Sequence, residues 1–334
     1  RGIAWVRSDG TRRAEMPVAA FDGNGIVSQL EILRGDLTDV LYQATRGAAE
    51  YRFDTRISTI DPDGDGIRVT LSDGSVVHAD LVVGADGPHS AVRHLTFGPE
   101  EQFVRRLGGY HAWFTTPDVI GLDGWYLMFQ AAGGLNASLR PSHDAATAKA
   151  GLAFRSEPIE YDRRDLAAQQ ALLADRFRDA GWYCGELLSA AAQSDDFYFD
   201  AFVQVHMDTW SAGRVTLCGD AGYCASPLSG MGTSLALVGA YVLAGDLGPA
   251  TALDAARIEV ALRRYEKVMR PYVNRCQDLP GGLDGYAPVS ERDISSAATA
   301  MKWLQRWPLR LYAGRKWFSA AESIDLPDYH FTAV

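Results

Sequence analysis

The chain has 334 residues, of which 47% are hydrophobic and 22% are charged, a composition typical of a soluble globular protein with one or two domains. Its formal net charge of −10 argues against a nucleic-acid or anionic-membrane partner, and no basic stripe is present. The longest apolar run, Ala236–Leu247, contains two glycines and an aspartate and is too short to span a bilayer.

The cysteines and histidines indicate neither a disulfide framework nor a metal site. None of the four cysteines is part of a CxxC pair, and the histidines form no HxH or HxxxH cluster. Reduced thiols and a cytoplasmic location are therefore expected, and no signal peptide is visible. The four cysteines are Cys184, Cys218, Cys224 and Cys276.

The first 50 residues predict a β-hairpin and then a helix. Two strands, Gly2–Val6 and Arg12–Val18, flank the turn signal Ser8-Asp9-Gly10. Asp36–Ala49 has helical periodicity with an aspartate at its start. The apolar residues that share one face of this helix are Leu37, Val40, Leu41 and Ala44.

Three further strands are predicted at Tyr51–Ile60, Ile67–Ser72 and Val76–Ala79, with turns at Asp61–Gly64 and Ser72–Gly74. The continuous apolar run that follows, at residues 81–85, is typical of a strand buried on both faces. It ends at Asp86-Gly87-Pro88, and a helix is expected from about Ser90.

Residues 103–205 have a different character, with frequent aromatic residues and repeated glycine turns. The pattern predicts antiparallel strands with one helix, Asp165–Ala180, as a separate sheet inserted into the first domain. Near Gly213 the chain returns to the first domain. A charged helix, Thr251–Arg270, is then expected to stop at Pro271, and the remaining residues are expected to be mostly helical.

The segment 214–247 is the most informative in the chain. A short strand, Arg214–Cys218, ends at Gly219-Asp220, and a turn-rich stretch with Pro227 and Gly230–Gly232 leads into a long apolar helix. Such a connection brings a carboxylate and the positive end of a helix to one small ligand.

The chain has three segments whose order and spacing resemble those of the FAD-dependent aromatic hydroxylases. The segments are Arg34 at a helix start, Asp86–Arg93 after a strand, and Gly219–Gly232. This family consists of single-component monooxygenases with the p-hydroxybenzoate hydroxylase fold. Within that class the chain resembles more closely the tetracycline-inactivating and related bacterial monooxygenases. The resemblance implies a mixed α/β (α+β) fold with a Rossmann-like FAD-binding domain, an inserted antiparallel-sheet substrate domain and a helical C-terminus.

The resemblance also implies the domain boundaries. Residues 19–102 and 206–278 would form the FAD-binding domain, without its N-terminal βαβ unit. Residues 1–18 and 103–205 would form the substrate-binding sheet domain, and residues 279–334 a C-terminal helical region.

By resemblance, the FAD-binding residues lie in all three segments, and the Asp-Gly segment also serves NADH or NADPH. Asp220 would bind the ribityl chain, and the loop after it would lie along the isoalloxazine ring. The full set is Arg34, Asp86, Gly87, Arg93, Gly219, Asp220, Pro227, Gly230, Met231 and Gly232.

Residue chemistry supports these roles independently. Asp220 can accept a hydrogen bond from a sugar-like hydroxyl, and glycines at 230 and 232 let the backbone approach a flat ring. The free N–H groups of the following helix would stabilise negative charge at one edge of that ring. Many relatives carry histidine where this chain has Tyr223, so histidine-assisted chemistry is less favoured here.

The implied reaction has two halves: NAD(P)H reduces the flavin, and reduced flavin reacts with O2 to give a C4a-hydroperoxide that transfers one oxygen atom. The substrate would be a small aromatic or polycyclic molecule enclosed by the aromatic-rich region. Candidate contacts, each of which could instead be plain sheet core, are Tyr110, Trp113, Tyr126, Phe129, Asn136, Phe154 and Phe202. No catalytic acid or base is identified.

The glycine loop that would hold the FAD pyrophosphate is not found. Asp22-Gly23-Asn24-Gly25 is the nearest candidate, and it lacks both the third glycine and a preceding buried strand. About 60–80 residues of two βα units would precede Arg34 in the family. The chain is therefore expected to be a fragment of a longer enzyme.

Two other functions remain open at this point. A flavin reductase or dehydrogenase of the same fold would use the same cofactor site without inserting oxygen. A flavin-free binding protein would explain the missing glycine loop.

Overall fold

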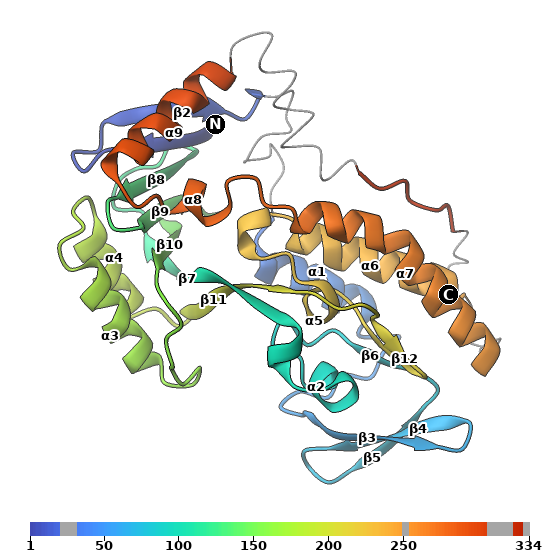
Figure 1. The fold of residues 1–334 in the computed structure, drawn as a ribbon. Helices are drawn as coiled ribbons and strands as arrows, with labels where there is room; N and C mark the ends of the chain where they lie inside the picture. The colour runs from blue at the N-terminus through green and yellow to red at the C-terminus, as the bar shows by residue number, and fades with distance from the viewer. Residues whose placement is uncertain (21–31, 249–253, 306–322, 330–334) are drawn as a thin grey trace. The chain divides into compact units, whose positions relative to one another are not determined.

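The computed structural model describes residues 1–20, 32–248, 254–305 and 323–329, and these fall into two compact units (Figure 1). The Asp22–Gly25 candidate lies outside the described residues. Unit 1 consists of the described residues within Arg1–Arg34, Arg106–Phe202 and Pro280–Ser319. Unit 2 consists of those within Gly35–Arg105, Val203–Leu279 and Ala320–Val334.

Unit 1 is built on a seven-stranded sheet with the order β11-β7-β10-β9-β8-β1-β2. The predicted N-terminal hairpin is confirmed, and β1 also pairs in parallel with β8. The strands are β1 (Gly2–Val6), β2 (Arg12–Pro17), β7 (Val104–Pro117), β8 (Trp125–Ala131), β9 (Leu135–Pro141), β10 (Thr147–Arg155) and β11 (Tyr198–Val205).

The strand register divides this sheet into two faces. His111 of β7, Ala153 of β10 and Asn136 of β9 are directly paired, so their side chains lie on one side, which we call the His111 face. The opposite side is the helix face, because Arg176 of α3 lies 5.3 Å from the centre of the Phe154 ring. Two helices, α3 (Leu166–Phe177) and α4 (Cys184–Ala191), occupy this part of the chain, where the sequence predicted only the first.

The His111 face is covered by the segment that contains α8 (Gly282–Tyr286) and α9 (Glu291–Leu304). The side-chain amides of Gln130 and Asn136 donate to the carbonyl of Tyr286 at 2.9 and 2.7 Å. α9 packs on β2 and β8, as Figure 1 also shows. The described C-terminal part of unit 1 is therefore largely helical, as predicted.

Unit 2 contains two three-stranded sheets, β12-β13-β6 and β3-β4-β5. β3 begins and ends later than predicted and includes Pro62, because an edge strand does not need every N–H for pairing. The turn is therefore only Gly64-Asp65, which suits a tight hairpin since Gly64 has φ +57°. The strands are β3 (Ile57–Asp63), β4 (Gly66–Leu71), β5 (Val76–Ala79), β6 (Val82–Gly84), β12 (Ser211–Ala212) and β13 (Val215–Leu217).

β6 corrects a second expectation from sequence. The run 81–85 predicted a strand buried on both faces, but Val83 is 42% exposed between buried Val82 and Gly84. Within the described residues β6 pairs only with β13, and its Val83 side is not packed against an apolar layer.

α1 (Arg34–Thr45) starts two residues before the predicted helix and ends four residues before its predicted end. None of its residues is buried, and Val40 and Leu41 are exposed. The apolar residues predicted for one face of this helix are therefore not covered by the described part of the chain.

α6 (Gly232–Leu247) and α7 (Ala255–Gln277) pack side by side over the core of unit 2 (Figure 1). The prediction that Pro271 stops α7 is wrong, because the helix continues for six residues beyond it. A proline inside a helix costs about 3 kcal/mol. Burial of Tyr272, Val273 and Cys276 on the far side of the proline offsets this cost.

Two further findings concern the whole described chain. No helix in the described ranges combines the length and the apolar character that crossing a membrane requires. The four cysteines are all buried, and none of them forms a disulfide.

Tyr223 belongs to the core of unit 2. Its hydroxyl lies 2.7 Å from the Tyr265 hydroxyl, which in turn donates to the carbonyl of Leu217 at 3.1 Å. Gly239 of α6 makes room for this pair, because a Cβ there would overlap the Tyr223 hydroxyl oxygen. Tyr223 therefore joins a strand to two helices.

We expect Gly239→Ala to destabilise the protein by about 2 kcal/mol, because the added methyl overpacks a rigid contact. Tyr223→Phe removes the overlapping oxygen, so the double variant should be more stable than the sum of the single effects. Urea unfolding of the four proteins measures this coupling. Additive effects would show that the two residues do not meet as described.

Candidate functional site

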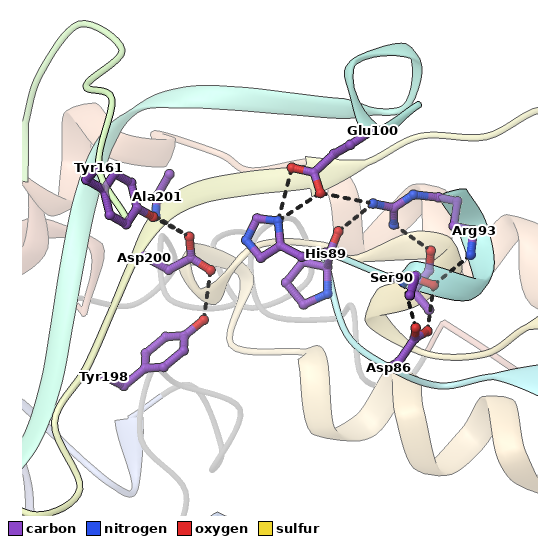
Figure 2. Close-up of polar contacts among 12 residues, drawn as sticks. Asp86, His89, Ser90, Arg93, Glu100, Tyr161, Tyr198, Asp200 and Ala201 are labelled. Atoms are coloured by element: carbon purple, nitrogen blue, oxygen red, sulfur yellow. Dashed lines mark hydrogen bonds and ion pairs between the residues drawn. The ribbon is translucent and has the colours of Figure 1, made fainter. Parts of the chain in front are cut away.

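The predicted Asp-Gly segment forms a helix start in unit 2. Asp86 accepts hydrogen bonds from the Ser90 hydroxyl at 2.5 Å and from the backbone N–H groups of Ala91 and Val92 at 2.7 and 3.1 Å (Figure 2). Ser90 is the N-cap of α2 (Ala91–Phe97) and accepts from the Arg93 N–H, so the helix predicted from about Ser90 is confirmed. The carboxylate and the hydroxyl together satisfy three of the N–H groups at this helix start.

Arg93 connects this segment to the turn that carries Asp220. Its guanidinium is 1% exposed and donates to the carbonyls of Pro88 at 2.6 Å and Ala221 at 2.8 Å. Burial lowers the pKa of Arg93, and the nearby carboxylates of Glu100 and Asp86 oppose this shift. Glu100 also lies 3.0 Å from Nδ1 of His89 (Figure 2).

Through these contacts, Asp86 and Arg93 position two turns of unit 2. They fix the strand-to-helix turn after β6 and the turn after β13 to each other. Gly87 allows the first turn through its φ of +83°. Direct contact of these three residues with FAD or NAD(P)H stays a prediction.

The turn after β13 places Asp220 beside the start of α6. Gly219 has φ +65° and ψ −143°, a conformation that favours glycine, and it caps the short helix α5 (Asp220–Tyr223). Asp220 is half-buried, and a Cβ built on Gly232 would lie 4.0 Å from its Oδ1. The carboxylate and the first residue of α6 therefore share one small region.

The loop between them is held by serine contacts that the sequence analysis did not identify. Ser226 is 4% exposed and has φ +74° and ψ 148°, a strained conformation for a residue with a side chain. Its hydroxyl accepts from the Leu228 N–H, and its carbonyl accepts from the Ser229 hydroxyl at 2.8 Å. No sequence signal marks this conformation, because a following proline favours a negative φ at the preceding residue and Ser226 has the opposite sign.

The start of α6 can hold an acceptor group. Its N-cap, Met231, provides no side-chain cap, and Gly230 has φ +66° with no atom of the described residues within 4 Å of a Cβ built on it. A 16-residue helix with uncapped N–H groups favours negative charge at this end. A carboxylate that accepts from hydroxyls, next to such a helix start, fits the ribityl chain and ring edge of a flavin.

The seven predicted substrate residues lie on opposite faces of the unit 1 sheet. Tyr110, Phe129 and Phe154 lie on the helix face, where Tyr110 stacks with Phe154 at 5.6 Å and with Phe199 at 5.7 Å. This is the sheet core that the sequence analysis gave as the alternative. The other four lie on the His111 face: Trp113, Tyr126, Asn136 and Phe202.

Polar groups gather on the His111 face near Phe202. The His111 ring lies 4.6 Å from Phe202 and 5.9 Å from Tyr198. Asp200 is 3% exposed and accepts from the hydroxyls of Tyr198 and Tyr161, both at 2.9 Å (Figure 2). Burial and the Asp200 charge raise the pKa of both tyrosines, so each keeps its proton.

Arg34 acts on this same cluster: its charge adds to the burial that lowers the pKa of His111, and it partly opposes the rise in the pKa of Tyr198. The predicted cofactor arginine, which belongs to unit 1, thus lies within electrostatic reach of the His111 face. His111, Tyr198 and Asp200 were not predicted from sequence, because single polar residues in an aromatic-rich stretch give no pattern.

Among the residues described, no group of three His, Cys, Asp or Glu side chains is arranged to hold a metal ion. The polar clusters above are therefore interpreted through hydrogen bonding and charge.

Comparison with known proteins gives a family and several relatives. The FAD binding domain family matches residues 30–278. An uncharacterized protein of Mycobacterium tuberculosis (strain CDC 1551 / Oshkosh), MT1298, is 42% identical over 300 residues, covering 88% of this chain and 78% of its own. A flavin-dependent monooxygenase from an unknown prokaryotic organism is 41% identical over 301 residues, covering 90% and 74%.

Among solved structures, the tetracycline destructase Tet(51) superposes with a TM-score of 0.76 at 30% sequence identity. The match covers 98% of this chain and 80% of that protein. The predicted mixed α/β fold and the predicted family are both confirmed by these similarities.

The buried imidazole of His111 provides a test of this geometry. Burial lowers the pKa of His111 to about 4, below its usual value of 6.5, so the unfolded state binds the proton first as the pH falls. The wild-type protein should therefore lose about 3 kcal/mol of unfolding free energy between pH 6.5 and pH 4 that a His111→Phe variant does not lose. Urea unfolding at both pH values measures the difference.

His206→Phe is the matched control, because His206 is only half-buried and the fall in its pKa is smaller. An equal loss of stability in the wild-type protein and in His111→Phe would contradict the buried, neutral imidazole.

Proposed function

Because the chain belongs to the family of FAD-dependent monooxygenases, we propose that it is an NAD(P)H-using enzyme that inserts one atom of O2 into a small aromatic or polycyclic substrate. The observation that carries this proposal is the Asp220 carboxylate beside the uncapped start of α6. When bound there, FAD supplies the hydride-accepting and oxygen-activating chemistry implied by the family resemblance.

In this proposal Asp220 accepts a hydrogen bond from a ribityl hydroxyl, worth about 1.5–3 kcal/mol for a charged acceptor. The N–H groups at Gly232 and after it stabilise negative charge at the pyrimidine edge of the flavin ring. Gly230 and Pro227 form the backbone surface along that ring.

The residues that position this site have their own proposed roles. Arg93 and Asp86 hold the turns on which the cofactor rests, and Gly87 keeps the first turn tight. Unit 2 would be the cofactor unit. By the family resemblance, Arg34 at the start of α1 would supply a positive charge for FAD. Unit 1 would hold the substrate on its His111 face.

The substrate class is proposed from similarity and from side chains together. Tet(51) is a tetracycline destructase by name, and tetracycline is a polycyclic molecule. Trp113 is half-buried and lies over Gly151, where a Cβ would overlap its indole ring, so this side of the sheet carries an aromatic ring packed on the backbone. Four buried, unoxidised cysteines are consistent with the cytoplasmic location that we also propose.

We expect Asp220→Ala to lower flavin affinity by about 10- to 100-fold, the loss of one charge-assisted hydrogen bond. Circular dichroism should stay unchanged, because the carboxylate is only half-buried. Equilibrium dialysis with the visible flavin spectrum measures the affinity. Asp208→Ala, at an exposed aspartate of unit 2, is the control, and full retention of flavin by Asp220→Ala would remove the proposed role.

Oxygen insertion is tested directly with ¹⁸O2, NADPH or NADH, and tetracycline as the probe substrate. One ¹⁸O atom in the product, detected by mass spectrometry, supports monooxygenation. A product formed without ¹⁸O would identify a non-oxygenating flavin reductase or dehydrogenase. Absence of bound flavin and of product would identify a flavin-free binding protein.

A further inference from the structure

We propose that Gln204 and Gln277, which we call the glutamine clamp, are positioning residues for the cofactor, because they hold the strained turn at Ser226. The inference rests on the proposed function, since the loop that begins with this turn is the one proposed to lie along the flavin ring. It adds two residues that act on the flavin through the loop rather than by contact. All the contacts that support it lie within unit 2.

The turn at Ser226 needs support from its surroundings. Ser226 has φ +74° and ψ 148°, close to a region that is populated almost only by glycine. A residue stays in such a conformation only where the contacts around it hold the chain there. The Ser226 hydroxyl accepts from the Leu228 N–H at 3.4 Å, which is a long and weak hydrogen bond. Shorter contacts hold the residues just before it.

Gln277 holds the carbonyl of Cys224, two residues before Ser226. Its Nε2 donates to the carbonyls of Val205 at 2.7 Å and Cys224 at 3.2 Å. The Val205 N–H also donates to the Cys224 carbonyl, at 3.0 Å, so this oxygen accepts two hydrogen bonds. Gln277 is the last residue of α7 and reaches the loop because the helix continues beyond Pro271.

Gln204 holds the next carbonyl and joins the two amides. It is 6% exposed, and its Nε2 donates to the carbonyls of Gln277 at 2.8 Å and Ala225 at 3.4 Å. The Gln277 carbonyl is at the C-terminal end of α7, where carbonyls have no partner within the helix. With its Nε2 hydrogens used, Gln204 accepts through Oε1 from Nε2 of His206 at 2.9 Å, which fixes the orientation of the amide.

Ser229 connects the strained turn to the start of α6. The Ser226 carbonyl accepts from the Ser229 N–H at 3.0 Å and from the Ser229 hydroxyl at 2.8 Å. The Ser229 hydroxyl oxygen accepts in turn from the Met231 N–H at 3.1 Å. Met231 is the N-cap of α6. If Ser226 relaxed to an ordinary negative φ, these contacts at the helix start would be lost.

A general structural role for the glutamines makes a different prediction from the clamp. If they only stabilise the core of unit 2, their removal has the same effect whichever residue occupies position 226. If they hold a strained turn, their removal matters less when that residue is glycine, which adopts the conformation without strain. The residue at position 226 therefore separates the two roles.

The test is a double-mutant cycle between Gln277→Met and Ser226→Gly, with amide hydrogen exchange of the flavin-free protein as the readout. Methionine keeps the length of the side chain without its hydrogen bonds. Gln277→Met should speed exchange of the Ser229 and Met231 amides about tenfold, the factor for one hydrogen bond. In the Ser226→Gly background the same change should speed it only about twofold.

Flavin affinity, measured by equilibrium dialysis with FAD, should follow the same pattern. Gln277→Met and Gln204→Met should each weaken FAD binding about tenfold with serine at position 226 and about twofold with glycine there. The matched control is Gln169→Met, because Gln169 is a buried glutamine of unit 1 whose amide donates to the Asp162 carbonyl at 2.8 Å. It should leave both loop exchange and FAD affinity unchanged.

Equal effects of Gln277→Met with serine and with glycine at position 226, or unchanged loop exchange, would overturn the inference. Gln204→Met provides the same cycle if Gln277→Met does not fold. Because exchange is measured without flavin, its result is independent of the proposed function. Faster exchange that glycine suppresses, in a protein that binds no FAD, would sustain the clamp on the loop and reject the proposed function. FAD binding with unchanged loop exchange would reject the clamp alone.

Discussion

The buried guanidinium of Arg93 is the interaction on which the candidate cofactor site depends. Removing a guanidinium from water is costly, and here two backbone carbonyls and the nearby Glu100 repay that cost. The carbonyls belong to Pro88 and Ala221, which follow two different strands of one sheet. The position of Asp220 relative to the start of α2 is therefore set by the Arg93 guanidinium. Because this group is buried, water cannot replace its two carbonyl partners.

This arrangement separates two kinds of residue within the family motifs. Asp86 and Arg93 are engaged by the chain itself, through helix N–H groups and carbonyls, so their chemistry is explained by folding alone. Gly230 and the start of α6 are different: within the described residues, nothing lies within 4 Å of a Cβ at Gly230, and the N-cap residue Met231 provides no side-chain cap. A bound ligand would account for Gly230 and the start of α6. Asp86 and Arg93 account for the fixed shape of the site.

Sequence patterns predicted the features that depend on neighbouring residues and missed those that depend on distant ones. The hairpin turn at Asp9-Gly10, the helix from about Ser90 and the helix after Gly232 are all local, and each was predicted. Pro271 continues a helix only because distant core residues bury its neighbours. Aromatic content likewise marked the region around β7 without revealing the register that sends Tyr110 and His111 to opposite faces.

The alternation of side chains along β7 connects the packing on the two faces of the unit 1 sheet. Tyr110 and Phe199 stack on the helix face from neighbouring strands β7 and β11, 5.7 Å apart and nearly parallel. Because successive side chains of a strand point to opposite faces, the same stack fixes His111 against Phe202 on the other side. The aromatic residues on the helix face thus hold the buried, neutral His111 in position on the other face.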